Sequence, residues 1–432
     1  KLLLYDTLGP YASLNVFGDL SADSEREPSK CWQTKAGFEG GIGIELALFG
    51  ETIADWGTDF DIWDKTLFEG TCIADPYTET PPDISDPAFT PWSLRITNST
   101  GAWVYEDKLN LEQAIDGHWL ISGNSLKVLS KISENGDVIF AKSFTSVEES
   151  TPVPMSITAA IPTSAITILA LSTNPTGILA LSNDGKLLWN RIADLSSESP
   201  RGLASVVETE DGYIVGGAIL DENTLSNDAW IFKIDKTGTV IWSEKYGTAE
   251  ATEWITSIIS TTDGFLATGR SFSTSQEPAH QPFIIKFNSN GEVIWKKVIT
   301  GCDTTESLTI SKSLLSHDGD YILGGSFGTG STKAVLIKIK PDGKLGWIYG
   351  FRNDTVSTLG LDVKDAVQLT DGGYLLSGTI WTAGTKDYLF AARTDAVGRP
   401  VWVKRISDNE NDNSAAAALT GEGGAIIAGY SG

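Results

Sequence analysis

Sulfur-containing and basic residues are scarce in this sequence of 432 residues. There are 3 Cys, 1 Met and 3 His, and 32 Lys+Arg stand against 56 Asp+Glu, so the formal net charge is −24. Three cysteines are too few for a disulfide scaffold. So acidic a surface repels phosphate backbones and anionic lipids, which argues against nucleic-acid and membrane-surface roles. No apolar run approaches the roughly 18–20 residues that span a bilayer, and the start at Lys1 rather than Met is typical of a processed or truncated product.

Glycine and tryptophan, by contrast, are abundant, with 44 Gly and 14 Trp, and they recur in a fixed pattern. Alternating apolar runs flank a turn glycine, and an aromatic residue follows four positions later, which is typical of a hairpin of half-buried strands. An upstream hairpin with an Asp-Gly turn precedes most copies, as in "ETEDGYIVGG" from Glu208. Two hairpins make a four-stranded meander, and its return every 52 to 55 residues predicts propeller blades. The glycine–aromatic steps are Gly136–Phe140, Gly185–Trp189, Gly238–Trp242, Gly291–Trp295, Gly343–Trp347 and Gly398–Trp402.

The two ends of the propeller region are expected to complete one blade together. "NSAAAALTGEGGAIIAGYSG" supplies a first hairpin and stops at Gly432, while "SLRITNSTGAWVYEDKL", from Ser93, aligns without a gap on the second hairpin "WIFKIDKTGTVIWSEKY". Counting this composite of residues 93–109 and 411–432, we predict an all-β fold with a seven-bladed β-propeller over residues 93–432, closed by N- and C-terminal strands. The blade from about Ser146 to Leu195 has lost its Asp-Gly turn. Each outer tryptophan is expected to pack between neighbouring sheets.

These repeats resemble the secreted and surface-exposed β-propellers of bacteria and archaea, whose blades read DGGY-hydrophobic-G and then K-hydrophobic-D-x-x-G-x-x-x-W. The resemblance covers Ser93 to Gly432 and implies the fold. A propeller hosts many activities, so the resemblance implies no particular function.

Residues 1–92 are predicted to form a separate module that ends in a proline-rich linker, "DPYTETPPDISDPAFTPW". "GGIGIELALFGETIADWGTDFDIWD" predicts a strand with Ile42, Ile44, Leu46 and Leu48 on one face, then a turn and a second strand. This stretch resembles the small β-sandwich modules of surface proteins, although it departs from their pattern at Trp56 and Asp64. Two interpretations of residues 1–10 stay open. They form either a free strand that inserts into a neighbouring subunit or the first strand of their own sandwich.

Several side chains outside the repeat are candidates for metal binding or modification. Asp59 and Asp61 are expected on one strand face with Asp55 and Asp64 nearby, and clustered hard oxygens of this kind suit Ca²⁺; the alternative is a solvated acidic face. Cys31 and Cys72 either pair as a disulfide or remain buried thiols. Asn98 and Asn353 are in Asn-x-Ser/Thr acceptor sites for glycosylation in an exposed turn or loop.

Propeller sites usually lie where the innermost strands and the neighbouring loops meet the mouth of the central channel. Polar loops with aromatic residues there would bind a sugar or a peptide, although any solvated propeller rim has the same composition. The three histidines fall on turns of different blades or opposite faces, so neither a His-metal centre nor a Ser-His-Asp triad is expected. The candidate ligand-binding residues are Glu253, Trp254, Asp303, Glu306, Asp365 and Trp381.

The sequence therefore favours a non-enzymatic extracellular protein of the cell surface. It would act as a structural or filament subunit, or as an adhesion module that presents a rigid propeller to a protein or glycan partner. Self-assembly through the N-terminal segment and glycosylation fit this prediction, and no cofactor is expected except Ca²⁺. The alternative is a carbohydrate-active lyase or hydrolase that uses carboxylates at the channel mouth.

Overall fold

The computed structural model describes residues 8–22, 32–48, 51–70, 109–123, 127–133, 137–148, 151–164, 166–171, 176–192, 200–248, 251–273, 280–299, 307–328, 332–351, 358–382, 387–406, 412–420 and 425–431. All regular structure in these ranges is β, as predicted, and the chain forms two compact units, one with residues 1–76 and the other with most of residues 77–432. With no helix described, none is present there that could cross a bilayer. The predicted boundary at residues 92 and 93 lies outside the described residues.

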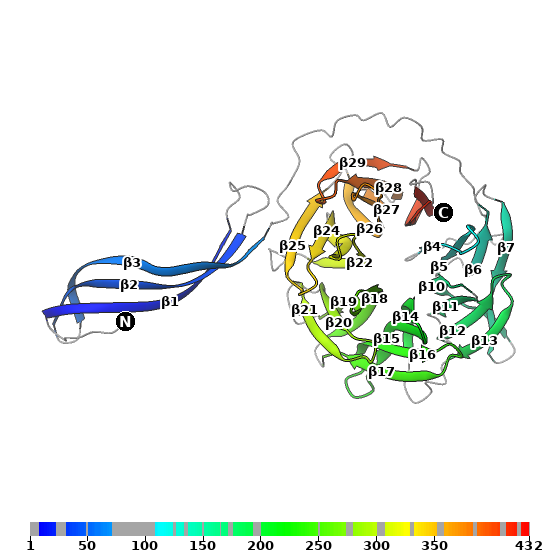
Figure 1. The fold of residues 1–432 in the computed structure, drawn as a ribbon, viewed down its shortest axis with the longest axis horizontal. Coiled ribbons are helices and arrows are strands. Elements are labelled where there is room, and N and C mark those ends of the chain that lie inside the picture. Colours follow the sequence, from blue (N-terminus) through cyan, green and yellow to red (C-terminus); the bar gives the residue numbers. More distant parts are fainter. Residues whose placement is uncertain are drawn as a thin grey trace. The chain divides into compact units, whose positions relative to one another are not determined.

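The larger unit is a ring of antiparallel four-stranded sheets, each with its strands in chain order (Figure 1). The six sheets are β4 (Leu109–Gln113), β5 (Trp119–Gly123), β6 (Val128–Ile132) and β7 (Val138–Ser143); β10 (Ile157–Pro162), β11 (Ile166–Leu171), β12 (Gly177–Ser182) and β13 (Leu187–Ile192); β14 (Pro200–Glu208), β15 (Gly212–Leu220), β16 (Asn227–Asp235) and β17 (Val240–Tyr246); β18 (Thr252–Thr261), β19 (Gly264–Phe272), β20 (His280–Phe287) and β21 (Val293–Val298); β22 (Leu308–Leu315), β23 (Tyr321–Phe327), β24 (Lys333–Ile339) and β25 (Leu345–Phe351); and β26 (Thr358–Gln368), β27 (Tyr374–Thr382), β28 (Asp387–Thr394) and β29 (Pro400–Arg405). A short hairpin of β8 (Thr145–Glu148) and β9 (Thr151–Pro154) joins the first two sheets.

Six complete blades are thus found against the seven predicted. A two-stranded sheet of β30 (Asp412–Leu419) and β31 (Ala425–Ser431) lies between the last and first blades, with β30 in contact with β26, β27 and β28 on one side and β4 on the other (Figure 1). The hairpin expected to complete it, residues 93–108, lies outside the described residues, and Leu109 belongs to β4 instead. The blade that lost its Asp-Gly turn nevertheless has all four strands, β10 to β13.

An ion pair inside the blade explains why the Asp-Gly turn and the third-strand lysine recur together. In the β18–β21 blade, the ammonium of Lys286 is 1% exposed and lies 2.6 Å from the Asp263 carboxylate of the turn. A buried ammonium needs such a partner, because desolvation of an unpaired charge is costly. The same pair forms in five blades. Its members are Asp116–Lys131, Asp211–Lys233, Asp263–Lys286, Asp318–Lys338 and Asp371–Arg393.

In the exceptional blade, β10–β13, both charges of the pair are absent. Lys286 stands five residues before the turn glycine Gly291, and the residue five before Gly185 is the fully buried Ala180. The blade that lost the aspartate of its turn has therefore also lost the buried cation.

Neighbouring blades are tied near the rim by the tryptophan of each outer strand. Trp242 of β17 lies against Gly291 in the next blade, where an added Cβ would come within 3.1 Å of the indole, and its Nε1 donates to the Ser289 carbonyl at 3.0 Å. Trp295 of β21 likewise donates to the Pro341 carbonyl at 3.1 Å. The prediction that this tryptophan packs between sheets is confirmed at these junctions, and the core between blades is apolar.

The described part of the N-terminal unit is one antiparallel sheet of β1 (Leu8–Ala22), β2 (Trp32–Leu48) and β3 (Glu51–Gly70), in that order. The sheet places Leu8 and Gly9 in a strand that pairs with β2 of its own chain. A second sheet, which a sandwich requires, is not among the described residues, so the sandwich stays a prediction.

The register gives this sheet two different faces, because directly paired residues share a face. Ile42, Ile44 and Leu46 alternate along one face of β2, and Trp56 of β3 pairs with Ile44. The other face carries the four predicted calcium ligands, because their β2 partners occupy the alternate positions. These pairs are Asp55–Glu45, Asp59–Gly41, Asp61–Glu39 and Asp64–Gly37. Calcium binding at this face stays a prediction.

Candidate functional site at the channel

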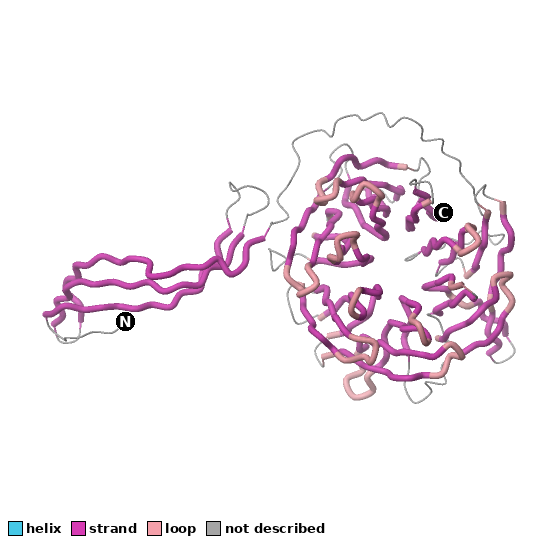
Figure 2. The backbone as a smooth tube through the Cα atoms, in the orientation of Figure 1, coloured by secondary structure: helices cyan, strands magenta, loops and turns pink. Residues whose placement is uncertain are grey.

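The innermost strands converge on the middle of the ring (Figure 2) and are joined to one another by polar side chains. A β-bulge interrupts the pairing of β10, β14, β18, β22, β26 and β30 with the next strand of each sheet. A bulge re-aims the side chains that follow it, and in this ring polar side chains at or near the bulges meet the next blade. We call these interblade contacts the inner belt. They are Asn110 Nδ2 to Thr158 O, Thr158 Oγ1 to Leu203 O, Ile258 N to Ser205 Oγ, Ser313 Oγ to Ser257 Oγ, Lys312 Nζ to Asp365, and Ala417 N to Asp365 Oδ2.

Asp365, predicted as a ligand-binding residue, is a member of the inner belt. One carboxylate oxygen lies 2.9 Å from Lys312 Nζ of the preceding blade, and the other accepts the Ala417 N–H of the following sheet at 3.1 Å. Its side chain is 8% exposed. The charge of Asp365 raises the pKa of Lys312, with Glu112 adding to the effect and desolvation opposing it. Through these two contacts Asp365 links three neighbouring sheets, and ligand binding by Asp365, which also lines the channel cavity, stays a prediction.

The channel cavity itself has a volume of about 390 Å³ and is bounded by β4, β10, β14, β18, β22 and β26. The charged residues among its described lining are Glu112 and Asp365, matched by Lys312 and Lys364. Apart from the amide of Asn110, the rest are small hydroxyl-bearing or apolar side chains. A charge-balanced lining of this kind does not supply a free pair of carboxylates.

The strongest candidate for a functional group is Glu253, the second residue of β18. Its side chain is 5% exposed, and its Oε1 accepts hydrogen bonds from Thr248 Oγ1 at 3.0 Å and Ser271 Oγ at 3.5 Å. Its Oε2 is fully buried and has no hydrogen-bond partner in the described part of the chain. Burial raises the pKa of Glu253, and the nearby charge of Asp228 adds to this, against the hydrogen bonds from Thr248.

Comparison among the blades shows that the fold does not require a carboxylate at this position. Glu253 stands ten residues before the turn aspartate Asp263, and the equivalent residues of the next two blades are Leu308 and Leu361. These leucines are 2% and 0% exposed. A carboxylate buried where sister blades bury leucine lowers stability, and groups of this kind concentrate at functional sites.

Asp228, which the sequence did not single out, faces the same turn as Glu253. Its carboxylate lies against Gly247, where any Cβ would come within 1.9 Å of Asp228 Oδ1, and the next residue is the Thr248 that binds Glu253. Burial raises the pKa of Asp228, the charge of Asp221 adds to it, and Lys245 opposes it. Two carboxyl groups with raised pKa therefore flank Gly247 and Thr248. In both groups the raised pKa favours the protonated form more than in an ordinary exposed carboxyl group.

The predicted aromatic ligands do not join one site. Trp254 follows Glu253 directly and stacks with Arg270, whose guanidinium carbon is 4.9 Å from the ring centroid. Trp381, in β27, is half-buried and belongs with Asp365 to the β26–β29 sheet, so the complete blade β22–β25 separates both from Glu253. The structure thus leaves Asp365 and Trp381 in another blade, while Glu253 and Trp254 are consecutive in β18 and pair with Ser271 and Arg270 on opposite faces of the sheet.

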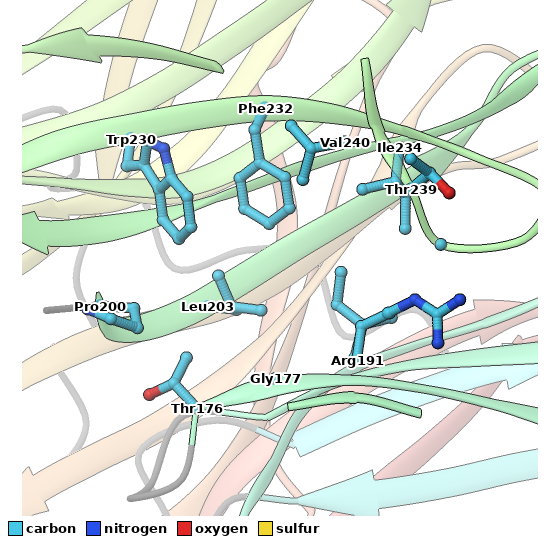
Figure 3. A pocket seen from close by; sticks show the side chains of 12 residues that line it. Thr176, Gly177, Arg191, Pro200, Leu203, Trp230, Phe232, Ile234, Thr239 and Val240 are labelled. Atoms are coloured by element: carbon cyan, nitrogen blue, oxygen red, sulfur yellow. The ribbon is translucent and has the colours of Figure 1, made fainter. Parts of the chain in front are cut away.

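A second cavity, of about 490 Å³, lies between the β10–β13 and β14–β17 blades (Figure 3). Trp230 and Phe232 form one wall, stacked with ring centroids 4.1 Å apart, and Pro200 and Leu203 face them. Its charged side chain is Arg191, which donates to the Thr237 carbonyl at 2.9 Å. With no carboxylate in its described lining, this cavity offers no acid–base pair.

Several predicted residues lie outside the described ranges. These are Asp303, Glu306, Cys31, Cys72, Asn98 and Asn353. The ligand, disulfide and glycosylation predictions at these positions therefore stay predictions. Among the described residues, no group of three or more His, Cys, Asp or Glu side chains is placed to hold a metal ion.

No family model matches this sequence, and no curated protein matches it significantly. Among solved structures, it is similar to a protein of unknown function from Bacteroides caccae, with 13% identity, 67% of this chain and 93% of that chain covered, and a TM-score of 0.40. A streptogramin B lyase structure gives 10% identity, 76% and 94% coverage and a TM-score of 0.47. A catalytically inactive virginiamycin B lyase from Staphylococcus aureus, with quinupristin, gives 9% identity, 75% and 92% coverage and a TM-score of 0.45. At this level of similarity these proteins assign no function to the chain.

Proposed function

We propose that this protein is a non-enzymatic protein of the cell exterior, whose propeller is a rigid disc used as a structural subunit or as a binding module. The observation that carries the proposal is the inner belt. It joins each described blade to the next from β4 to β30 and occupies both oxygens of Asp365. Because the Asp365 carboxylate at the channel binds groups of the two neighbouring sheets, it favours a structural role of the channel residues over a catalytic one.

The partner in this proposal is another protein or a glycan outside the cell. The net charge of −24 argues against nucleic acids and anionic lipid surfaces as partners. Trp254, which is partly exposed beside Arg270, marks the surface region where a small ligand would bind, since an aromatic ring suits the face of a sugar or a cationic side chain.

Electron microscopy of the protein on its native cells tests the structural role. Ordered filaments or a lattice, labelled by an antibody against the propeller, would support it. Dispersed single discs would refute assembly and direct attention to binding, for which a glycan array with the purified full-length protein is the next measurement.

A second candidate function, a carbohydrate-active lyase or hydrolase, is favoured by the raised pKa of Glu253 and of Asp228. One such group would serve as general acid and the other as base. Incubation with a panel of polysaccharides, read by release of reducing ends or unsaturated sugars, tests it. Turnover by the wild type that is lost in Glu253→Gln would establish the enzyme and overturn the first proposal.

A further inference from the structure

Four consecutive outer strands expose pairs of large apolar side chains along the rim of the propeller. Each pair opens its strand directly before the rim aromatic residue, and the eight side chains are 39% to 53% exposed. We call these residues the rim arc. They are Val138 and Ile139 of β7, Leu187 and Leu188 of β13, Val240 and Ile241 of β17, and Val293 and Ile294 of β21. These strands follow one another around the ring (Figure 1).

Among the outer strands that the structure describes, the rim arc is confined to those four. At the same positions β25 has Leu345 and Gly346, and β29 has Pro400 and Val401, and none of these four is a large exposed apolar side chain. Large apolar side chains exposed in a repeated row mark interaction surfaces. The outermost strand of each blade is also a sheet edge, which can pair with another strand.

The charge of the rim arc strands is opposite to that of the protein. β7, β13, β17 and β21 contain five cations, Lys142, Arg191, Lys245, Lys296 and Lys297, against one anion, Glu244. In a chain with a net charge of −24, so basic a surface selects an acidic partner.

The N-terminal sheet has the complementary composition. β1, β2 and β3 together hold nine acidic residues and two lysines. Strand β3 is an edge strand of 20 residues, with Asp55, Asp59, Asp61 and Asp64 on one face and Trp56 on the other. A three-stranded sheet needs a second layer or further strands to bury its apolar face.

We propose that β3 of one copy of this chain adds to the outer edge of a rim arc strand in a second copy. Its aspartates then lie opposite the rim lysines and arginine as cross-strand pairs, and its apolar face continues the exposed valine, isoleucine and leucine pairs. A contact between two different surfaces of identical chains repeats from copy to copy, so it builds a filament. This inference rests on the proposed structural role and names its partner.

Analytical ultracentrifugation of the full-length protein over a wide concentration range tests the proposal. We expect the average mass of the wild type to rise with concentration and to fall with added salt, which screens the charge pairs. The double variant Ile241→Asp/Ile294→Asp should weaken association at least ten-fold. Ile115→Asp is the matched control, because Ile115 is 72% exposed in the β4–β5 turn, away from the rim arc.

A charge exchange between two copies identifies the surfaces directly. Lys296→Glu and Asp59→Lys should each weaken self-association, and an equimolar mixture of the two variants should restore it, as the reversed charges meet. Far-UV circular dichroism and melting curves confirm that each variant is folded.

A wild type that stays monomeric at every concentration, or rim variants that associate like the wild type, would overturn the proposal. If β3 instead paired with the propeller of its own chain, the wild type would stay monomeric at every concentration, which is the first of these results. An ordered lattice on cells together with unaffected rim variants would preserve the structural role and assign it to another surface.

Discussion

Removing the aspartate of an Asp-Gly turn should weaken its blade, because a buried ammonium loses its counter-ion. In Asp263→Ala, Lys286 would stay 1% exposed with one remaining hydrogen bond, 2.8 Å long, to Thr261 Oγ1. A charged hydrogen bond contributes about 1.5–3 kcal/mol, and Asp263 itself is well exposed, so we expect a loss of about 2 kcal/mol. The exposed pair of Asp184 and Lys186 gives the control, since Asp184→Ala removes a solvent-screened partner and should leave stability unchanged within experimental error.

The decisive variant removes both charges. Asp263→Ala combined with Lys286→Met leaves an apolar side chain of similar length, and we expect stability to return to within about 1 kcal/mol of the wild type. Hydrogen exchange read by mass spectrometry on peptides from β18 to β21 measures the opening free energy of this blade. A double variant no more stable than Asp263→Ala would refute the interpretation that Lys286 needs its partner, and with it the explanation of Ala180.

Three further predictions concern the channel face and the junctions between blades. Glu253→Leu should raise the free energy of unfolding by about 1–2 kcal/mol at pH 7. Because the folded-state pKa of Glu253 is raised, the wild type regains stability as the pH falls through that pKa. Thermal melts should therefore show the stability difference between the variant and the wild type shrinking in acid. Asp365→Ala should cost about 3 kcal/mol and speed exchange of the Ala417 amide, whereas unchanged exchange there would contradict its place in the inner belt. Trp242→Phe keeps the ring but loses the bond to Ser289, so urea titration should show a loss of about 1 kcal/mol, and a loss no larger than experimental error would argue against that tie.

Sequence periodicity carried the propeller prediction because each blade repeats the same local chemistry. Turn glycines Gly185, Gly238 and Gly291 all have φ near +80°, and each precedes a strand whose tryptophan reaches the next blade. The seventh blade was harder to place. Its two halves come from distant parts of the chain, and residues 93–108 lie outside the described residues.

The candidate site was only partly predictable, because the direction of a side chain in the innermost strands depends on the bulges. The shift between Val363 and Asp365 aims the Asp365 carboxylate at neighbouring blades, and alternation alone does not reveal it. Glu253 was predicted from its place near the channel. Its burial could also have been inferred by counting back from each Asp-Gly turn and finding Leu308 and Leu361 at the same position. Asp228 left no such signal, since its proximity to Glu253 arises from the packing of β16 on β18.

The two sets of ties between blades lie at different radii, and this has a mechanical consequence. The inner belt links strands at the channel, while Trp242 and Trp295 link turns near the rim. The two junctions on either side of the β18–β21 blade therefore have one hydrogen-bonded contact at the channel and another at the rim. Rotating one of these blades against the next must strain the inner-belt contact and the tryptophan contact together. A force applied at the rim would therefore be shared by both contacts, so the propeller can transmit that force from blade to blade before any one sheet separates from its neighbours.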